Sequence, residues 1–252
     1  MPYYYGGYYL SGDYMWFLGA MLVCLLLSAI ASGRVRSTFA KYSKFRCSSG
    51  LNGYETANRL LRANGINDIS VGQIRGQLTD HYHPKKQIVN LSQSTYDNNS
   101  VAAVAVAAHE IGHVMQKHDG NFLYRIRTAI VPVVNFGSYL AMPLVLVGLL
   151  LDAYSAIAIP DIGFKVAMVG VILYGGSLLF ALVTLPVELN ASKRAREMLL
   201  EQGILTEAEI KDAKKVLSAA AMTYFVSLLT SLVYFLRFLL RVLSLFGRRN
   251  NR

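Results

Sequence analysis

Four long segments without a charged residue dominate the sequence. They are residues 14–31, 129–151, 166–185 and 216–236. A helix needs about 20 apolar residues to cross the hydrocarbon core of a bilayer, and each segment approaches or exceeds that length. Hydrophobic residues make up 54% of the chain and charged residues only 16%. We therefore expect a mostly α-helical integral membrane protein with about four transmembrane helices.

The charges beside these segments predict an orientation in the bilayer. No basic residue precedes the first segment, so we interpret it as a retained anchor rather than a signal peptide. Five basic residues follow it, namely Arg34, Arg36, Lys41, Lys44 and Arg46. The positive-inside rule assigns that side to the cytoplasm. The connection at residues 152–161 has no Lys or Arg, as expected outside, although Lys165 stands against this.

The fourth segment conflicts with the same rule. A fourth crossing would leave Arg248, Arg249 and Arg252 outside. The alternative is that the end of the segment lies along the inner surface as a basic amphipathic helix. We favour a span, and both arrangements stay open.

The region between the first two segments has the patterns of a small α+β domain. It predicts a helix at residues 53–64 and strands at residues 69–74 and, within residues 81–92, at residues 87–91. Pro84 argues that the second strand lies at a sheet edge. An edge strand could hold an extended peptide by main-chain hydrogen bonds, and a purely structural hairpin is the alternative.

The motif H-E-x-x-H at residues 109–113 lies in an alanine-rich stretch without proline. Such a stretch predicts a helix, which we expect to end near residues 118–120. His109 and His113 would share one face of it and could bind one Zn²⁺ ion. Glu110 is rotated by about 100° from His109, so it could act as general base on a zinc-bound water without binding the metal. A chance match is the alternative.

A catalytic zinc site needs a third protein ligand and keeps one position open. The second and third apolar segments form a hairpin that returns the chain to the side of the two histidines. Glu188 is the next carboxylate after that return, so we expect it to be the third ligand. Asp119 and Glu55 are its rivals.

The remaining histidines are weaker candidates for functional residues. His118 lies five residues after His113, which rotates it off the ligand face, so we expect a capping or surface role. His81 and His83 are candidates for contacting the substrate or an intermediate, and turn or surface roles are the simpler interpretation.

Three segments together resemble the YugP-like family of membrane zinc metallopeptidases, also called neutral zinc metallopeptidases. They are GQLTDHYHP (residues 76–84), VAAHEIGHVMQ (residues 106–116) and LPVELNASKRA (residues 185–195). The family is similar to the HtpX and Ste24 proteases. The resemblance implies a zincin-like catalytic domain of gluzincin type, in which Glu110 is the base and the zinc ligands are His109, His113 and Glu188.

The chain departs from the family pattern at two positions. His83 and Asn190 stand where aspartate is usual. Asn190 could weaken a hydrogen bond to a ligand histidine, because groups behind the ligands orient them. Ser192, two residues further on, is a further candidate for supporting the site or the substrate.

These observations predict a membrane-embedded zinc endopeptidase that hydrolyses peptide bonds of membrane or membrane-associated proteins through a zinc-activated water. The alternative is a membrane scaffold or substrate-holding protein with structural zinc. Metal transport is less favoured, because the apolar segments hold few ionisable residues. The expected partners are a peptide or protein substrate and the lipid bilayer. The net charge of +10 is scattered around the apolar segments, which argues against nucleic acid.

The expected organisation has five parts. They are residues 1–31 with the first transmembrane helix, residues 32–128 as the catalytic region on the cytoplasmic side, residues 129–185 as the transmembrane hairpin, residues 186–215 with the third-ligand helix and the following helix, and residues 216–252 with the fourth hydrophobic helix and a basic tail. The family resemblance implies the plasma membrane of a prokaryote. The sequence does not indicate an oligomeric state.

Overall fold

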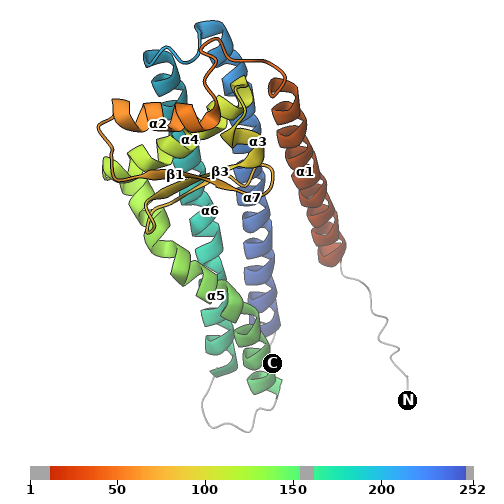
Figure 1. Cartoon of the computed structure of the whole chain (residues 1–252). Helices are drawn as coiled ribbons and strands as arrows, with labels where there is room; N and C mark the ends of the chain where they lie inside the picture. The colour runs from red at the N-terminus through yellow and green to blue at the C-terminus, as the bar shows by residue number, and fades with distance from the viewer. Residues whose placement is uncertain (1–11, 154–161, 248–252) are drawn as a thin grey trace, which may run out of the picture. The chain divides into compact units, whose positions relative to one another are not determined.

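The computed structural model describes residues 12–153 and 162–247 (Figure 1). The helices are α1 (Gly12–Tyr42), α2 (Gly53–Ala63), α3 (Gln93–Tyr96), α4 (Val101–His118), α5 (Phe122–Ala153), α6 (Ile162–Glu201) and α7 (Glu207–Gly247). The strands are β1 (Ser70–Ile74), β2 (His81–His83) and β3 (Ile88–Ser92). The expectation of a mostly helical chain with a small sheet is confirmed.

Each uncharged segment lies within one of the long helices α1, α5, α6 and α7. Within the described residues, these four helices are long and apolar enough to cross a membrane. The expected number of candidate spans is therefore confirmed. The fourth segment is part of one unbroken helix from Glu207 to Gly247.

Helix α6 differs from the sequence-based expectation. We expected a boundary near residue 185 and a new helix carrying Glu188, but α6 continues through Pro186 to Glu201. Proline removes one backbone donor from a helix, and helices in apolar surroundings tolerate it where neighbouring groups compensate. Glu188 therefore lies in the interior of a 40-residue helix.

The chain divides into two compact units. The helical unit is the described part of residues 1–30, 133–178 and 226–252, and the mixed unit is residues 31–132 and 179–225. The mixed unit contains the sheet and all of the candidate site residues.

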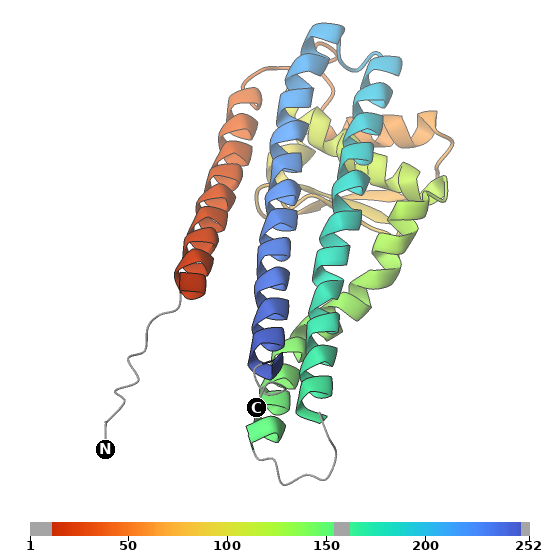
Figure 2. The ribbon, with the colours of Figure 1, turned by 180° about the vertical axis from the view of Figure 1, so that it is seen from behind.

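In the helical unit, α5 and α6 approach each other through small residues. A Cβ atom on Gly170 would lie 2.6 Å from the carbonyl oxygen of Ala141, and one on Gly148 would lie 2.5 Å from that of Gly163. Figure 2 shows these parts of α5 and α6 side by side. Such close backbone contact is typical of helices that pack within a membrane, where small residues form the interface.

In the mixed unit, the three strands form one sheet in the order β1-β3-β2. Strand β3 pairs in parallel with β1, from Ser70↔Ile88 onward, and antiparallel with β2, where His81 is opposite Asn90. The strand that we expected at residues 87–91 is thus the central one, and the edge prediction for it is wrong. Pro84 lies instead in the turn after β2, which is one of the two edge strands, so its missing N–H costs the sheet no hydrogen bond.

Helices α2 and α4 lie on the same side of this sheet (Figure 1), and local signals determine where they begin. Asn52 and Glu55 form a capping box at the start of α2, and the Ser100 hydroxyl accepts from the Ala103 N–H at the start of α4. Helix α4 has buried residues on nearly every face. An alanine-rich helix of this kind belongs in a core, so its few polar side chains need partners inside the protein.

Candidate metal centre

The two histidines of the motif lie on one face of α4, as their spacing predicts. Their ring centroids are 4.8 Å apart. His113 is buried and His109 is partly buried. The helix therefore presents two imidazole nitrogens to the same point in the interior.

Glu188 reaches these histidines from α6. Its Oε2 atom lies 3.1 Å from Nε2 of His109 and 3.5 Å from Nε2 of His113. Four ligands placed tetrahedrally about 2.0–2.1 Å from a zinc ion stand roughly 3.3–3.4 Å from one another. The spacing of the three donor atoms fits a single ion of this size, so the three residues could hold a metal ion.

A glycine on α4 permits this arrangement. A Cβ atom on Gly112 would lie 2.6 Å from the carbonyl oxygen of Ala191 on α6. Any larger residue would push the two helices apart. Because Gly112 precedes His113 and Ala191 lies three residues after Glu188, this contact fixes the distance between the ligands.

Other side chains bind the outer nitrogens of both rings. Gln116 donates through Nε2 to the Val187 carbonyl and to Asn190 Oδ1, at 2.8 and 2.9 Å. Its Oε1 atom therefore faces His113 Nδ1, 2.9 Å away, and accepts the ring proton. Ser192 Oγ lies 3.2 Å from His109 Nδ1. Both rings thus turn Nε2 toward the ligand cluster, as supporting hydrogen bonds do in metal sites.

The two candidates for supporting residues differ in how they act. Ser192 contacts a ligand histidine directly, whereas Asn190 reaches His113 only through Gln116. Asn190 also accepts from Arg194 Nε at 3.0 Å. The amide oxygen of Asn190 is therefore engaged by Gln116 and Arg194, and Asn190 supports His113 indirectly.

Arg127, near the start of α5, is a member of the site that the sequence did not reveal. Its Nη1 atom lies 2.7 Å from Oε1 of Glu188. The Glu188 side chain is almost completely buried, and a buried carboxylate requires a partner. Arg127 thus balances the oxygen of Glu188 that does not face the histidines.

Glu110 is buried beside the cluster and does not belong to it. The pKa of this carboxyl is raised to about 7, mainly because the group is buried; His109 and a hydrogen bond from the Tyr82 backbone lower the pKa, and nearby Asp80 and Glu188 raise it. Asp80 is held in place by the backbone N–H and the hydroxyl of Ser92, at 2.7 and 2.9 Å. A carboxyl with a pKa near neutrality can both accept and release a proton.

His109 and Glu110 line a cavity of about 170 Å³, which we call the metal-centre pocket. Its other lining residues are mostly apolar: Val35, Phe39, Leu78, Asp80, Val106, Val216, Leu217, Ala220 and Tyr224. A cavity with apolar walls and a few polar groups at one end is the usual form of a small binding site.

The remaining candidates lie outside the cluster. The His81 ring contacts the Thr79 carbonyl and the Asn90 amide, and His83 accepts from the Lys86 N–H, so both support the hairpin. His118 is exposed beside Asp119, which binds Arg194. Glu55 belongs to the capping box of α2. Neither rival of Glu188 belongs to the cluster with His109 and His113.

Among the site residues that the sequence analysis did not predict, one could have been identified from its spacing and the others could not. Gln116 lies three residues after His113 on a predicted helix, so its spacing could have indicated a contact. Arg127, Asp80 and Tyr224 come from distant parts of the chain, and no local pattern connects them with His109.

Comparison with known proteins identifies a family for this chain. Residues 17–243 match the sequence profile of the family described as "Putative neutral zinc metallopeptidase". A relative from Bacillus subtilis (strain 168), named "Putative membrane protease YugP", is 41% identical over 237 residues, which cover 94% of this chain and all of the relative. No solved structure matches the chain. The matched residues include the motif on α4 and Glu188 on α6, and the chain belongs to this metallopeptidase family.

Proposed function

We propose that this protein is a membrane-embedded zinc endopeptidase that hydrolyses peptide bonds of membrane or membrane-associated proteins. The observation that carries the proposal is the cluster of His109, His113 and Glu188, with Glu110 in the adjoining pocket. The family match and the name of the relative support this class of enzyme. The four candidate spans support a location in the membrane.

In this proposal the two Nε2 atoms and the Glu188 carboxylate hold Zn²⁺, a gluzincin set like that of the HtpX and Ste24 proteases. When bound, zinc supplies a Lewis acid that polarises the scissile carbonyl and lowers the pKa of a water molecule to about 7. Glu110 accepts a proton from the attacking water and delivers it to the leaving amine. Its pKa of about 7 suits both transfers near neutral pH.

We infer that the substrate lies along β2. This strand is at the edge of the sheet, and the backbone of Tyr82 within it hydrogen-bonds Glu110. An extended peptide that adds to a sheet edge gains main-chain hydrogen bonds. At this edge it would bring a peptide bond next to the base, with one of its side chains directed into the metal-centre pocket.

A structural zinc site is less well supported. Structural sites are closed by four protein ligands. Among the described residues the cluster has three potential ligands, and one of them, His109, lines the same pocket as Glu110. The basic residues after the first apolar segment support a cytoplasmic active site.

The decisive experiment is Glu110→Gln in the purified full-length protein, with zinc content and cleavage of a casein panel and of co-reconstituted membrane proteins as readouts. We expect zinc to be retained and cleavage to fall by about 10²- to 10⁴-fold, because the base is lost and the ligands are intact. Glu197→Gln, on the exposed surface of α6, is the matched control. Unchanged proteolysis in Glu110→Gln would refute the mechanism.

A further inference from the structure

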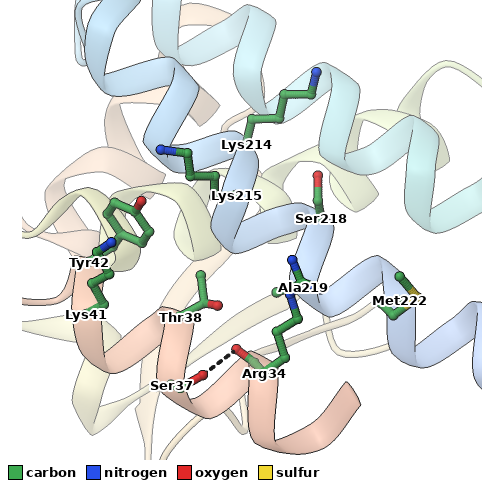
Figure 3. Close-up of a pocket in the computed structure, with 10 residues that line it drawn as sticks. All are labelled: Arg34, Ser37, Thr38, Lys41, Tyr42, Lys214, Lys215, Ser218, Ala219 and Met222. Atoms are coloured by element: carbon green, nitrogen blue, oxygen red, sulfur yellow. Dashed lines mark hydrogen bonds between the residues drawn. The ribbon is translucent and has the colours of Figure 1, made fainter. Parts of the chain in front are cut away.

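A second cavity lies in the mixed unit, between the C-terminal part of α1 and the N-terminal part of α7 (Figure 3). Its volume is about 510 Å³, within the range of roughly 300–1,000 Å³ that is usual for small-molecule sites. The lining residues are Arg34, Ser37, Thr38, Lys41, Tyr42, Lys214, Lys215, Ser218, Ala219 and Met222. None of them lines the metal-centre pocket. We call this cavity the cationic pocket.

The lining of the cationic pocket is strongly positive. It includes Arg34, Lys41, Lys214 and Lys215, and no carboxylate is among its ten residues. The Nζ atoms of Lys41 and Lys215 lie 5.3 and 5.6 Å from the centre of the same Tyr42 ring. Two positive groups on different helices thus converge on one aromatic side chain, and like charges held in this way repel each other.

A single carboxylate offsets part of this charge. Asp212 accepts from Lys215 at 2.9 Å, and it stands one turn outside the cavity on α7. The described residues offer Arg34, Lys41 and Lys214 no carboxylate within ion-pair distance. The pocket therefore has a net positive charge that an anion would neutralise.

Hydroxyl groups on both helices complete the lining. Ser37 and Thr38 on α1 and Ser218 on α7 contribute them. Phosphate oxygens bind well where cationic side chains are combined with neutral donors, because charge-assisted hydrogen bonds are the stronger kind. Figure 3 shows Arg34 reaching toward Ala219 and Lys215 pointing toward Tyr42, whereas Lys214 extends away from α1.

The cationic pocket lies at the boundary between charged and apolar sequence on both helices. Arg34 follows the first uncharged segment by three residues, and Lys214 and Lys215 directly precede the fourth. Ala219 and Met222 lie inside that fourth segment and form an apolar part of the wall. The cavity is therefore amphipathic, as a lipid is. Its charged part matches a lipid headgroup, and its apolar part matches the beginning of the acyl chains.

We propose that the cationic pocket binds the phosphate of an anionic phospholipid headgroup. Arg34, Lys41, Lys215 and the hydroxyls contact the phosphate, Lys214 adds positive charge nearby, and Ala219 and Met222 contact the first carbons of the lipid. Free phosphate shares the anionic chemistry and cannot use the apolar wall. The proposal goes beyond the endopeptidase function and is independent of it.

The test measures binding of short-chain phosphatidylglycerol to the delipidated full-length protein, by native mass spectrometry and by titration in a neutral detergent. Phosphatidylcholine of the same chain length and inorganic phosphate are the other two probes. The pocket variant combines Lys41→Gln, Lys214→Gln and Lys215→Gln. The matched control combines Arg36→Gln, Lys44→Gln and Lys211→Gln, which removes the same charge from exposed positions outside the pocket, on α1, in the turn directly after α1 and on α7.

We expect the wild type to bind phosphatidylglycerol at least about tenfold more tightly than phosphatidylcholine or inorganic phosphate. The pocket variant should lose about tenfold or more of this affinity, and the control should stay within about threefold of the wild type. A third variant with Arg at the three pocket positions keeps the charge and should retain binding.

Three results would overturn the proposal. Equal losses in the pocket variant and the control would mean that binding depends on overall surface charge. Unchanged binding in the pocket variant would place the lipid elsewhere. Inorganic phosphate binding as tightly as phosphatidylglycerol would show that the ligand is a free anion rather than a lipid. Circular dichroism of the pocket variant checks that it is folded.

Discussion

The metal centre and the cationic pocket are both polar regions of the mixed unit, and they are built in opposite ways. In the metal centre the polar side chains are largely buried and each has a protein partner: Gln116 and Ser192 bind the histidines, and Arg127 binds Glu188. In the cationic pocket the lysines are exposed; Lys215 forms an ion pair with Asp212, and Lys41 and Lys215 also contact the Tyr42 ring.

The two regions differ in what holds their polar side chains in position. The metal centre is held in a productive geometry by the protein itself, which is what a catalytic site requires. The cationic pocket leaves its charges solvated until an anion arrives. Substitutions should therefore be costly in the first region and nearly neutral for folding in the second.

The largest effect is expected for Glu188→Gln. This change removes a proposed ligand charge and leaves Arg127 without its carboxylate partner. We expect zinc affinity to fall at least about a hundredfold and the free energy of unfolding to fall by about 3 kcal/mol. Metal titration and denaturant unfolding measure the two quantities. Zinc affinity equal to that of the wild type would show that Glu188 is not a ligand.

An intermediate effect is expected for Gly112→Ala. The added Cβ would lie 2.6 Å from the Ala191 carbonyl oxygen, so α4 and α6 must separate. We expect the free energy of unfolding to fall by about 1–3 kcal/mol, together with weaker zinc binding. Gly33→Ala on α1 is the control, because no atom lies within 4 Å of its added Cβ. That variant should be neutral or more stable by up to about 1 kcal/mol. Similar results for both variants would contradict the role given to the helix contact.

The smallest effect is expected for folding of the pocket variant that carries Lys41→Gln, Lys214→Gln and Lys215→Gln. In neutral detergent without added lipid, its free energy of unfolding should stay within about 0.5 kcal/mol of the wild type, because surface charges contribute little to stability. A loss of several kcal/mol would mean that these lysines are structural, and the contrast with the metal centre would fail.

The parts of the fold that the sequence predicted depend on neighbouring residues. The helix over residues 53–64, the strand near residues 69–74 and the end of the α4 helix follow from short-range signals, and the structure confirms them. Thr206 and Glu209 form a capping interaction of the same short-range kind before α7. Such signals act within one or two turns, so spacing alone reveals them.

The errors concern long-range arrangement. The position of β3 at the centre of the sheet depends on its parallel pairing with β1, which no pattern within β3 encodes. The continuation of α6 through Pro186 runs against the tendency of helices to end before a proline. In both cases tertiary contacts outweighed a local proline rule.

The sequence by itself determined that two histidines share a helix face, that a glutamate stands beside them and that four helices can span a membrane. Only the tertiary structure decided that Glu188 meets both histidines, that Arg127 balances it and that cations from α1 and α7 converge on Tyr42. The physical reason is that periodicity and capping act between near neighbours in the chain. The approach of distant residues depends instead on how closely helices pack, as at Gly112 and Ala191.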